Sequence, residues 1–261
     1  MSCQDLIANW NPWHGCTKIS PGCRHCYVYR QDEMYGSDIG SDLARKTLAF
    51  DLPVKRKRNK SYKIPPGSMV FTCFTSDFLL EDADAWRPDC WTMMRERSDC
   101  RFYFFTKRIH RFMECVPDDW GSGYPNVMVG CTVENQAMAD QRLPIFEALP
   151  IRYKTIIVAP MIERIDLSNY LNDSIEEVSI GGESGRGARP LDFDWVLSLR
   201  EQCIHAGVPF RFHQTGAKLI KDGRQYYIRR CYQHDQARKA GMDWRVGEGC
   251  DWGGWLAQLQ K

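Results

Sequence analysis

Short apolar runs alternate with helical stretches along most of the chain, and this alternation limits the fold more than any other feature. The runs are rich in Val, Ile, Phe and Thr, as is typical of strands buried on both faces of a parallel sheet. We predict six strands, at Met69–Phe74, Arg101–Thr106, Asn126–Thr132, Lys154–Ala159, Glu177–Gly181 and Pro209–His213. We predict helices at Trp86–Ser98, Asn135–Leu149 and Asp192–His205. Such βαβ units fit either a doubly wound sheet or a barrel, complete or partial.

Two segments do not follow this alternation. Residues 51–66 contain the basic run Lys55–Lys60 and a Pro-Pro-Gly turn, which predicts an exposed loop. Tyr62 is its one aromatic residue, so the loop lacks the interleaved rings of a single-strand binder, and nucleic acid is not favoured as its partner. The polar, basic segment after Gly216 predicts a C-terminal appendage, residues 217–261, on a main domain formed by residues 1–216.

The cysteine content points to metal or redox chemistry. The chain has twelve cysteines among 261 residues and a net charge of only +2, which gives no argument for binding to nucleic acid or membranes. No secretory leader is visible, and no apolar stretch approaches the length of about 18 residues that a membrane span needs. We therefore expect a cytoplasmic protein with reduced thiols and no membrane partner.

Three cysteines stand close together in a Gly- and Pro-containing loop. Cys16, Cys23 and Cys26 have the spacing C-x6-C-x2-C. A zinc site would need a fourth ligand, such as His14 or His25. A [4Fe–4S] cluster on three cysteines leaves one iron open, which can bind the amino and carboxylate groups of S-adenosylmethionine. Unconnected buried thiols fit this spacing less well. Packing as small apolar residues of the core is the favoured interpretation for the cysteines in predicted strands and helices, such as Cys73, Cys90, Cys115, Cys131 and Cys203.

Several further motifs carry a resemblance to a known family. The segment from Asn11 to Tyr27 has the pattern Asn-Pro-x-x-Gly-Cys-x6-Cys-x2-Cys-Tyr. It resembles the phage-associated three-cysteine-motif proteins, a radical-SAM-like family whose function is mostly unassigned. The resemblance covers roughly residues 9 to 240 and includes Phe74-Thr75-Ser76-Asp77-Phe78, Thr106-Lys107-Arg108, Cys131-Thr132-Val133-Glu134-Asn135-Gln136, Gly181-Gly182-Glu183-Ser184-Gly185 and His213-Gln214-Thr215-Gly216.

The resemblance implies a partial (β/α) barrel of the radical SAM type, of about six parallel strands. It implies a [4Fe–4S] cluster on Cys16, Cys23 and Cys26, S-adenosylmethionine as cofactor, and a flavodoxin or ferredoxin as one-electron donor. Two features depart from the pattern. The usual spacing is C-x3-C-x2-C, and relatives carry an acidic residue where this chain has Ala159. The role of that carboxylate is therefore absent here or moved to a neighbour such as Glu163.

The other motifs all follow predicted strands, so in a parallel barrel their side chains gather at the active-site face. We predict that Glu134 with Asn135 binds the ribose of the cofactor, and that Ser76 with Asp77 binds its methionine moiety. Each pair could instead cap the following helix. Gly181 and Gly182 let a ligand approach the backbone closely, where Glu183 accepts from an ammonium or hydroxyl group, or they form a turn that needs positive φ. His25 is expected to pack against the adenine. On the substrate side we expect Lys107, Arg108, His213 and Gln214.

We therefore predict a radical S-adenosylmethionine enzyme with an unidentified substrate. Three alternatives remain open at this point. Cleavage of the methionine-side C–S bond would transfer an aminocarboxypropyl group. A zinc-stabilised module would bind nucleic acid. A DNA or nucleotide repair enzyme is suggested only by the phage association and the barrel type.

Overall fold

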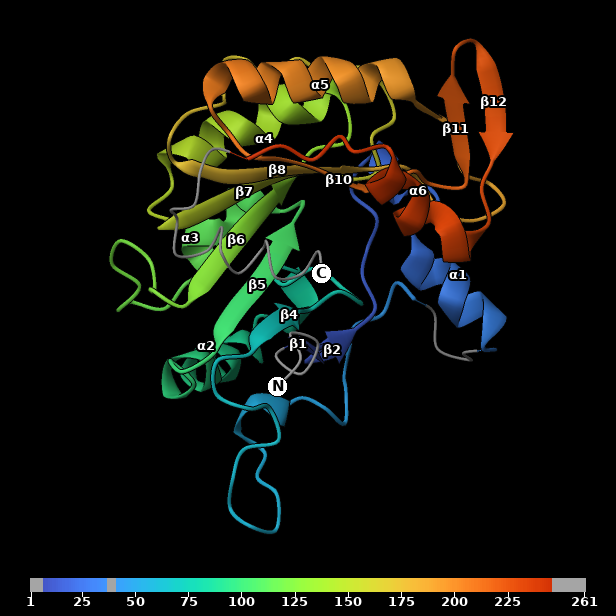
Figure 1. Cartoon of the computed structure of the whole chain (residues 1–261). Helices are drawn as coiled ribbons and strands as arrows, with labels where there is room; N and C mark the ends of the chain where they lie inside the picture. Colours follow the sequence, from blue (N-terminus) through green and yellow to red (C-terminus); the bar gives the residue numbers. More distant parts are fainter. Residues whose placement is uncertain (1–6, 37–40, 246–261) are drawn as a thin grey trace.

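A computed structural model describes residues 7–36 and 41–245 of the chain. At its centre a parallel sheet of seven strands curls into a half-barrel (Figure 1). The strands stand in the order in which they occur along the chain, without the reversal that defines a doubly wound sheet. Their bounds are Ile7–Trp10 (β1), Met69–Thr72 (β4), Arg101–Thr106 (β5), Val127–Thr132 (β6), Tyr153–Val158 (β7), Ile175–Gly181 (β8) and Phe210–Gln214 (β10).

All six predicted strands are present, which confirms the partial barrel in its coarse form. Strand β1 was not predicted. It is an edge strand of four residues that pairs with β4 alone, and Trp10 is its one buried residue. A segment this short has no apolar run long enough to mark it as a strand.

Most of the helices cover the outer, convex face of the sheet (Figure 1). The three predicted helices are confirmed. In two of them the first turn is closed by a side chain, since Asn135 caps α4 and Asp192 caps α5. The bounds are Tyr27–Met34 (α1), Arg87–Glu96 (α2), Phe112–Cys115 (α3), Gln136–Ala148 (α4), Phe193–Ala206 (α5) and Gln233–Lys239 (α6).

The two faces of the sheet differ in what they bury, and β5 shows this best. Phe102 and Phe104 point outward into the main core under the helices, whereas Tyr103 and Phe105 point into the barrel. The inner face holds only a small apolar cluster around Met69, Tyr103, Met128 and Ile157. Because successive side chains of a strand alternate between faces, every second residue of each strand is available to line the barrel interior.

The described part of the C-terminal appendage packs against the half-barrel. Strand β11 (Lys218–Lys221) pairs with β12 (Arg224–Tyr227) and with the short strand β9 (Leu191–Asp192). Helix α6 follows and lies against β10. The remaining part of the predicted appendage, residues 246–261, lies outside the described residues.

Two further features of the described chain bear on the sequence expectations. The predicted basic loop is exposed at its tip, over residues 56–61, and extends away from the sheet (Figure 1). Within the described residues, no helix has the length and apolar character needed to cross a membrane.

Candidate functional site

The three clustered cysteines lie on the segment between β2 and α1, residues 15–26, which we call the cysteine loop. Cys16 follows strand β2 (Trp13–His14), which pairs with β3 (Arg45–Lys46). Cys23 ends a 3-10 turn (Pro21–Cys23), and Cys26 is the residue before α1. All three thiols are half-buried, whereas the other described cysteines are buried or, at Cys231, exposed. Core packing is thereby confirmed for the five cysteines predicted to serve it: Cys73, Cys90, Cys115, Cys131 and Cys203.

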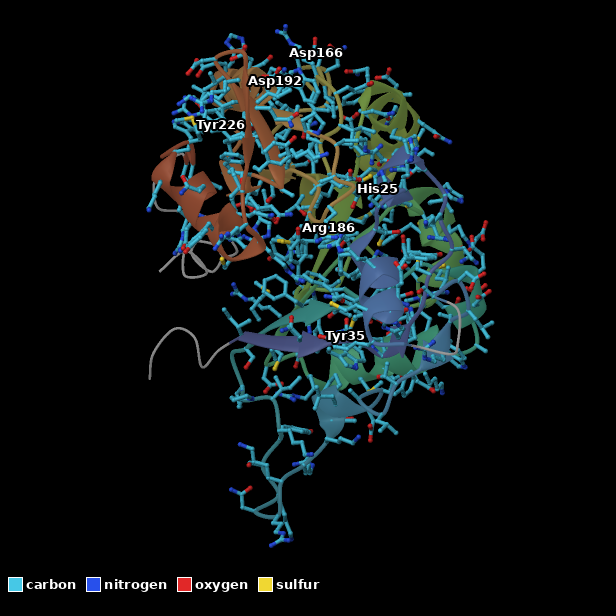
Figure 2. The ribbon with its side chains drawn as sticks, turned by 90° about the vertical axis from the view of Figure 1, so that its right-hand side faces the viewer. His25, Tyr35, Asp166, Arg186, Asp192 and Tyr226 are labelled. Carbon is cyan, nitrogen blue, oxygen red and sulfur yellow. The ribbon has the colours of Figure 1, made fainter. Side chains whose placement is uncertain are left out.

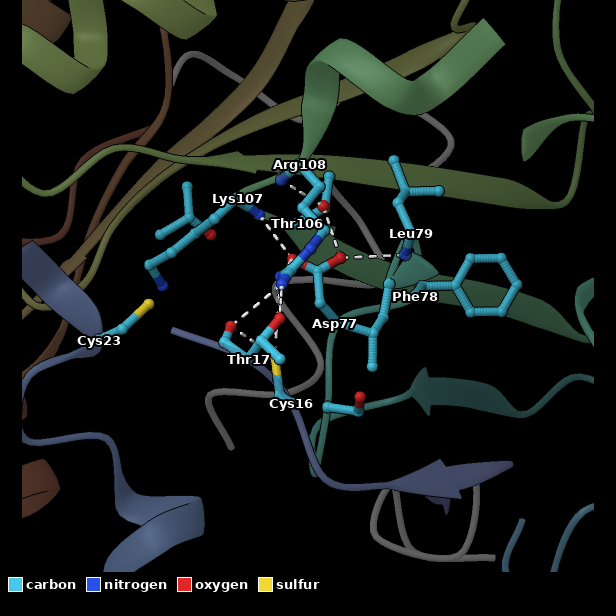
Figure 3. Close-up of polar contacts among 12 residues, drawn as sticks. Cys16, Thr17, Cys23, Asp77, Phe78, Leu79, Thr106, Lys107 and Arg108 are labelled. Atoms are coloured by element: carbon cyan, nitrogen blue, oxygen red, sulfur yellow. Dashed lines mark hydrogen bonds and ion pairs between the residues drawn. The ribbon is translucent and has the colours of Figure 1, made fainter. Parts of the chain in front are cut away.

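Arg108 and Asp77 hold the first part of this loop against the strand ends (Figure 3). Nη2 of Arg108 donates to the carbonyl and hydroxyl oxygens of Thr17, at 3.0 and 2.5 Å, and Nη1 lies 3.7 Å from Sγ of Cys16. Asp77 accepts hydrogen bonds from the Thr106 hydroxyl and the Lys107 backbone N–H, and ion-pairs with Arg108 at 3.5 Å. Arg108, only 2% exposed, is therefore part of the wall behind Cys16.

The environment of Cys16 opposes a bare thiolate but supplies one compensating charge. Burial, together with the carboxylate of Asp77, raises the pKa of Cys16 to about 12, while Arg108 acts in the opposite direction. A metal centre deprotonates a coordinating thiol outright, and the adjacent guanidinium would then stabilise the negative sulfur. The donor set around Cys16 thus fits a metal-bound thiolate.

Glu134 holds the second part of the loop. It is fully buried, and Oε1 accepts from the backbone N–H of Gly22 at 2.9 Å while Oε2 pairs with Arg142 at 2.9 Å. Burial alone would raise the pKa of Glu134, but Lys107 and Arg142 outweigh it and hold the pKa below its usual value. A Cβ on Gly22 would stand 2.9 Å from Cδ of Glu134, so the close approach requires glycine. Both carboxylate oxygens are engaged by protein groups.

The segment after β8 also holds the cysteine loop and the helix that follows it. Glu183 pairs with Arg189 at 2.5 Å, and Nη2 of Arg189 also donates to the Pro21 carbonyl at 3.0 Å. Arg30 of α1 donates to the Ser184 carbonyl at 2.6 Å. The strand-end motifs of β4, β5, β6 and β8 therefore converge on the cysteine loop, as the barrel architecture predicts.

A cavity of about 470 Å³ lies beside the cysteine loop, inside the half-barrel. This volume is typical of small-molecule and cofactor sites, which span roughly 300–1,000 Å³. One wall is aromatic, formed by inward-facing residues of β4 and β5 together with Phe74, which follows β4. The rest of the lining combines polar groups with Ile157, Ala159 and Pro160. The aromatic wall consists of Phe71, Phe74, Tyr103 and Phe105, and the polar groups include His25, Lys107, Glu177, Arg211, His213 and Arg230.

Most of the predicted site residues fall into two sets according to what they face, and Asp77 and Asn135 belong to neither set. Those that line the cavity are His25, Cys26, Lys107, Gly182, Glu183, His213 and Gln214. Three others, Ser76, Arg108 and Glu134, contact the cysteine loop directly. The Ser76 hydroxyl donates to the Gly15 carbonyl. Asp77 acts through Arg108 and the ends of β4 and β5. Asn135 caps α4 by accepting from the Met138 N–H, as in the alternative interpretation.

Gly181, the last residue of β8, and Gly182, which follows it, do not form the predicted turn with positive φ. Neither has a positive φ. A Cβ on Gly182 would lie 2.4 Å from the Thr215 carbonyl, and one on Gly181 would lie 3.0 Å from Cγ of Gln214. The end of the neighbouring strand β10 and the residues after it therefore leave too little room for a side chain at either position. Gly182 also lines the cavity. Glu163, considered as a replacement for the acidic residue missing at Ala159, is exposed and accepts from the Gln136 N–H at 2.8 Å.

Two charged residues of the cavity lining, Glu177 and Arg211, were not predicted from the sequence. Glu177 of β8 and Arg211 of β10 point inward from buried strands, and Arg245 lies 3.9 Å from the Glu177 carboxylate. Burial raises the pKa of Glu177 from 4.5 to about 7, although Arg211 and Arg245 act against it. Strand parity could have found both residues, because Glu177 shares the face of Gly181 and Arg211 shares that of His213.

The raised pKa of Glu177 predicts a specific pH dependence of stability. Well below pH 4.5 the Glu177 carboxyl is protonated in both the folded and the unfolded protein, and its contribution to the free energy of unfolding is fully present. As the pH rises to about 7 that contribution is lost, because the carboxyl ionises in the unfolded protein while it stays protonated in the folded one. We expect Glu177→Gln to gain stability relative to the parent over this window, by up to roughly 3 kcal/mol. Urea unfolding of both proteins at pH 5 and pH 8 measures the difference. Parallel pH profiles would refute the assignment.

The arrangement of ligand groups bears on which metal centre the loop suits. Among the described residues, no group of three or more His, Cys, Asp or Glu side chains is gathered closely enough to hold one metal ion. A zinc ion needs its sulfur ligands about 2.3 Å from a single centre. A four-iron cluster spreads its thiolates further apart, since each sulfur binds a different iron. His14, a possible fourth zinc ligand, already places Nε2 2.8 Å from the Asp32 carboxylate.

One of three comparisons with known proteins finds a family, and that family has no assigned function. No curated protein and no solved structure matches the chain. The profile of one family, described as Protein of unknown function (DUF5131), matches residues 5–248, which include the whole half-barrel, the cysteine loop and the appendage as far as it is described. The chain therefore belongs to the DUF5131 family.

Proposed function

We propose that the protein is a radical S-adenosylmethionine enzyme whose [4Fe–4S] cluster is held by Cys16, Cys23 and Cys26. One observation carries the proposal: the three half-buried thiols lie on one loop at the strand-end mouth of a parallel half-barrel, and Cys26 borders the cavity there. Three protein ligands would leave the fourth iron of such a cluster without a protein ligand, so that a small molecule could bind it.

The chain's own residues would then divide the work as their contacts indicate. Arg108, Glu134 and Arg189 fix the cysteine loop to the ends of three different strands. His25 offers a flat surface for an adenine ring, and Lys107 offers a cation for a carboxylate. When bound, the cofactor would supply the hard chemistry, the reductive cleavage of a C–S bond at its sulfonium, with the electron coming from the cluster.

Product analysis tests this proposal. Anaerobically reconstituted protein, given S-adenosylmethionine and dithionite, is expected to form 5′-deoxyadenosine and methionine at a rate above that of the Cys26→Ala variant. In the cell a flavodoxin or ferredoxin would take the place of dithionite. 5′-Methylthioadenosine as the main nucleoside would instead indicate aminocarboxypropyl transfer. If neither nucleoside forms from protein that carries a full cluster, the proposal fails.

A further inference from the structure

The C-terminal hairpin carries a concentration of charge that the whole-chain balance hides. Residues 218–239 contain seven Lys or Arg residues and two Asp residues, in a chain whose net charge is +2. Most of these cations are exposed, and the strand β12 that lies among them is exposed at every residue. Such a local excess of positive charge attracts a polyanion whatever the net charge of the protein.

Exposed aromatic rings are interleaved with these cations. Tyr226 is 41% exposed, Tyr227 76% and Tyr232 52%. The guanidinium of Arg224 lies 5.3 Å from the centre of the Tyr226 ring, so charge and ring are presented together. Large rings left in water beside cations are the features with which proteins hold single-stranded nucleic acid, by stacking on bases and pairing with phosphates. An acidic protein partner would need the charges but not the rings.

The hairpin is held rigidly enough to present these groups. Its turn is Asp222-Gly223, with φ of 52° and 70°, as a two-residue turn of type I′ requires. Strand β11 pairs with β9 on its other edge, and Leu219 packs against the main core. Figure 2 shows Tyr226 on this part of the molecule, at the end opposite the basic loop of residues 55–60.

The surface continues into the cavity. Arg230, Gln233 and His234, which follow β12, all line the cavity, and the rings of His234 and His213 meet edge to face at 4.6 Å. Beyond them lies the aromatic wall, where the ring centres of Phe74 and Phe105 are 4.6 Å apart. A chain bound across the hairpin therefore has a path along which a flat base can enter the cavity and stack.

We propose that the segment of residues 218–239 binds single-stranded nucleic acid and leads one nucleotide into the cavity, where it is the substrate. The second half of this statement rests on the proposed function, whereas binding of the strand does not. Duplex is disfavoured because its bases are already stacked on one another, so the exposed tyrosines cannot stack on them.

Fluorescence anisotropy of the full chain with labelled 20-nucleotide strands tests the inference. The probes are oligo-dT and oligo-U, with a 20-base-pair duplex and polyglutamate as competitors. We expect binding of at least one single strand, with log K falling by about 0.7 per phosphate contact as log salt rises. We expect Tyr227→Ala to weaken it about tenfold and Tyr227→Phe to preserve it, because the ring is what stacks.

The chain supplies its own matched control for charge. The double variant Lys221→Ala with Arg224→Ala should weaken binding and flatten its salt dependence. Lys57→Ala with Arg58→Ala removes the same charge from the exposed basic loop and should change neither. The inference is overturned if no strand binds, if duplex or polyglutamate competes as well as a single strand, or if Tyr227→Ala binds like the parent. None of these readouts uses the cluster, so loss of binding and loss of cluster chemistry are distinguishable.

Discussion

Replacing any one of Cys16, Cys23 or Cys26 by Ala is expected to remove the iron–sulfur cluster completely. Each thiolate would bind a different iron, and among the described residues no other cysteine combines half-burial with a place on this loop. We expect the broad absorption near 400 nm of a thiolate-held cluster to be lost in each variant.

Two controls separate this effect from general damage. Cys231→Ala alters an exposed thiol outside the loop and should keep the cluster. Each loop thiol is only half-buried, so its loss should leave far-UV circular dichroism close to that of the parent. If one of the three variants kept its iron, or if Cys231→Ala lost it, the ligand assignment would be wrong.

Glu134→Ala is expected to have the largest effect on stability of any single change near the site. It would leave Arg142, 5% exposed, without its carboxylate and the Gly22 N–H without its acceptor. Breaking a buried ion pair from one side costs about 3–5 kcal/mol. That is a large share of the roughly 5–15 kcal/mol by which a domain of this kind is stable. Urea unfolding measures the loss directly.

A matched control and a rescue sharpen this test. Glu163→Ala removes an exposed carboxylate at the start of α4 and should cost less than about 1 kcal/mol. The double variant Glu134→Leu with Arg142→Met removes both charges and should recover much of the loss, since apolar replacement of a whole buried pair is often neutral. If Glu134→Ala were as stable as Glu163→Ala and loaded a full cluster, Glu134 would not hold the loop.

The strands could be predicted from the sequence, but their order could not. Apolar runs mark β4, β5, β6, β7, β8 and β10 because most of the residues in these strands are buried, as in β4, β5 and β6. Whether such strands form a doubly wound sheet or a barrel depends on contacts between distant segments, which periodicity does not report. Strand β1 escaped because four residues with one buried side chain carry too little signal.

The candidate site shows the same division between position and contact. The sequence placed Asp77, Glu134 and Glu183 correctly after strands, because a strand end is a local feature. It could not show that these carboxylates already have partners within the protein. Glu134 is engaged by Arg142 and by the cysteine loop, which is distant in the sequence. Glu183 is engaged by Arg189 of the turn that follows it. Glu177 was missed because a glutamate on a buried strand resembles an ordinary strand residue until the inner face is known to line a cavity.

Metal and sulfide analysis of the parent protein, purified without air, tests the central claim most directly. We expect about four irons and four acid-labile sulfides per chain, because three thiolates, with no fourth protein ligand, suit a [4Fe–4S] cluster that binds a small molecule at its fourth iron. Stoichiometric zinc with no iron would contradict it and would identify the loop as a structural zinc site.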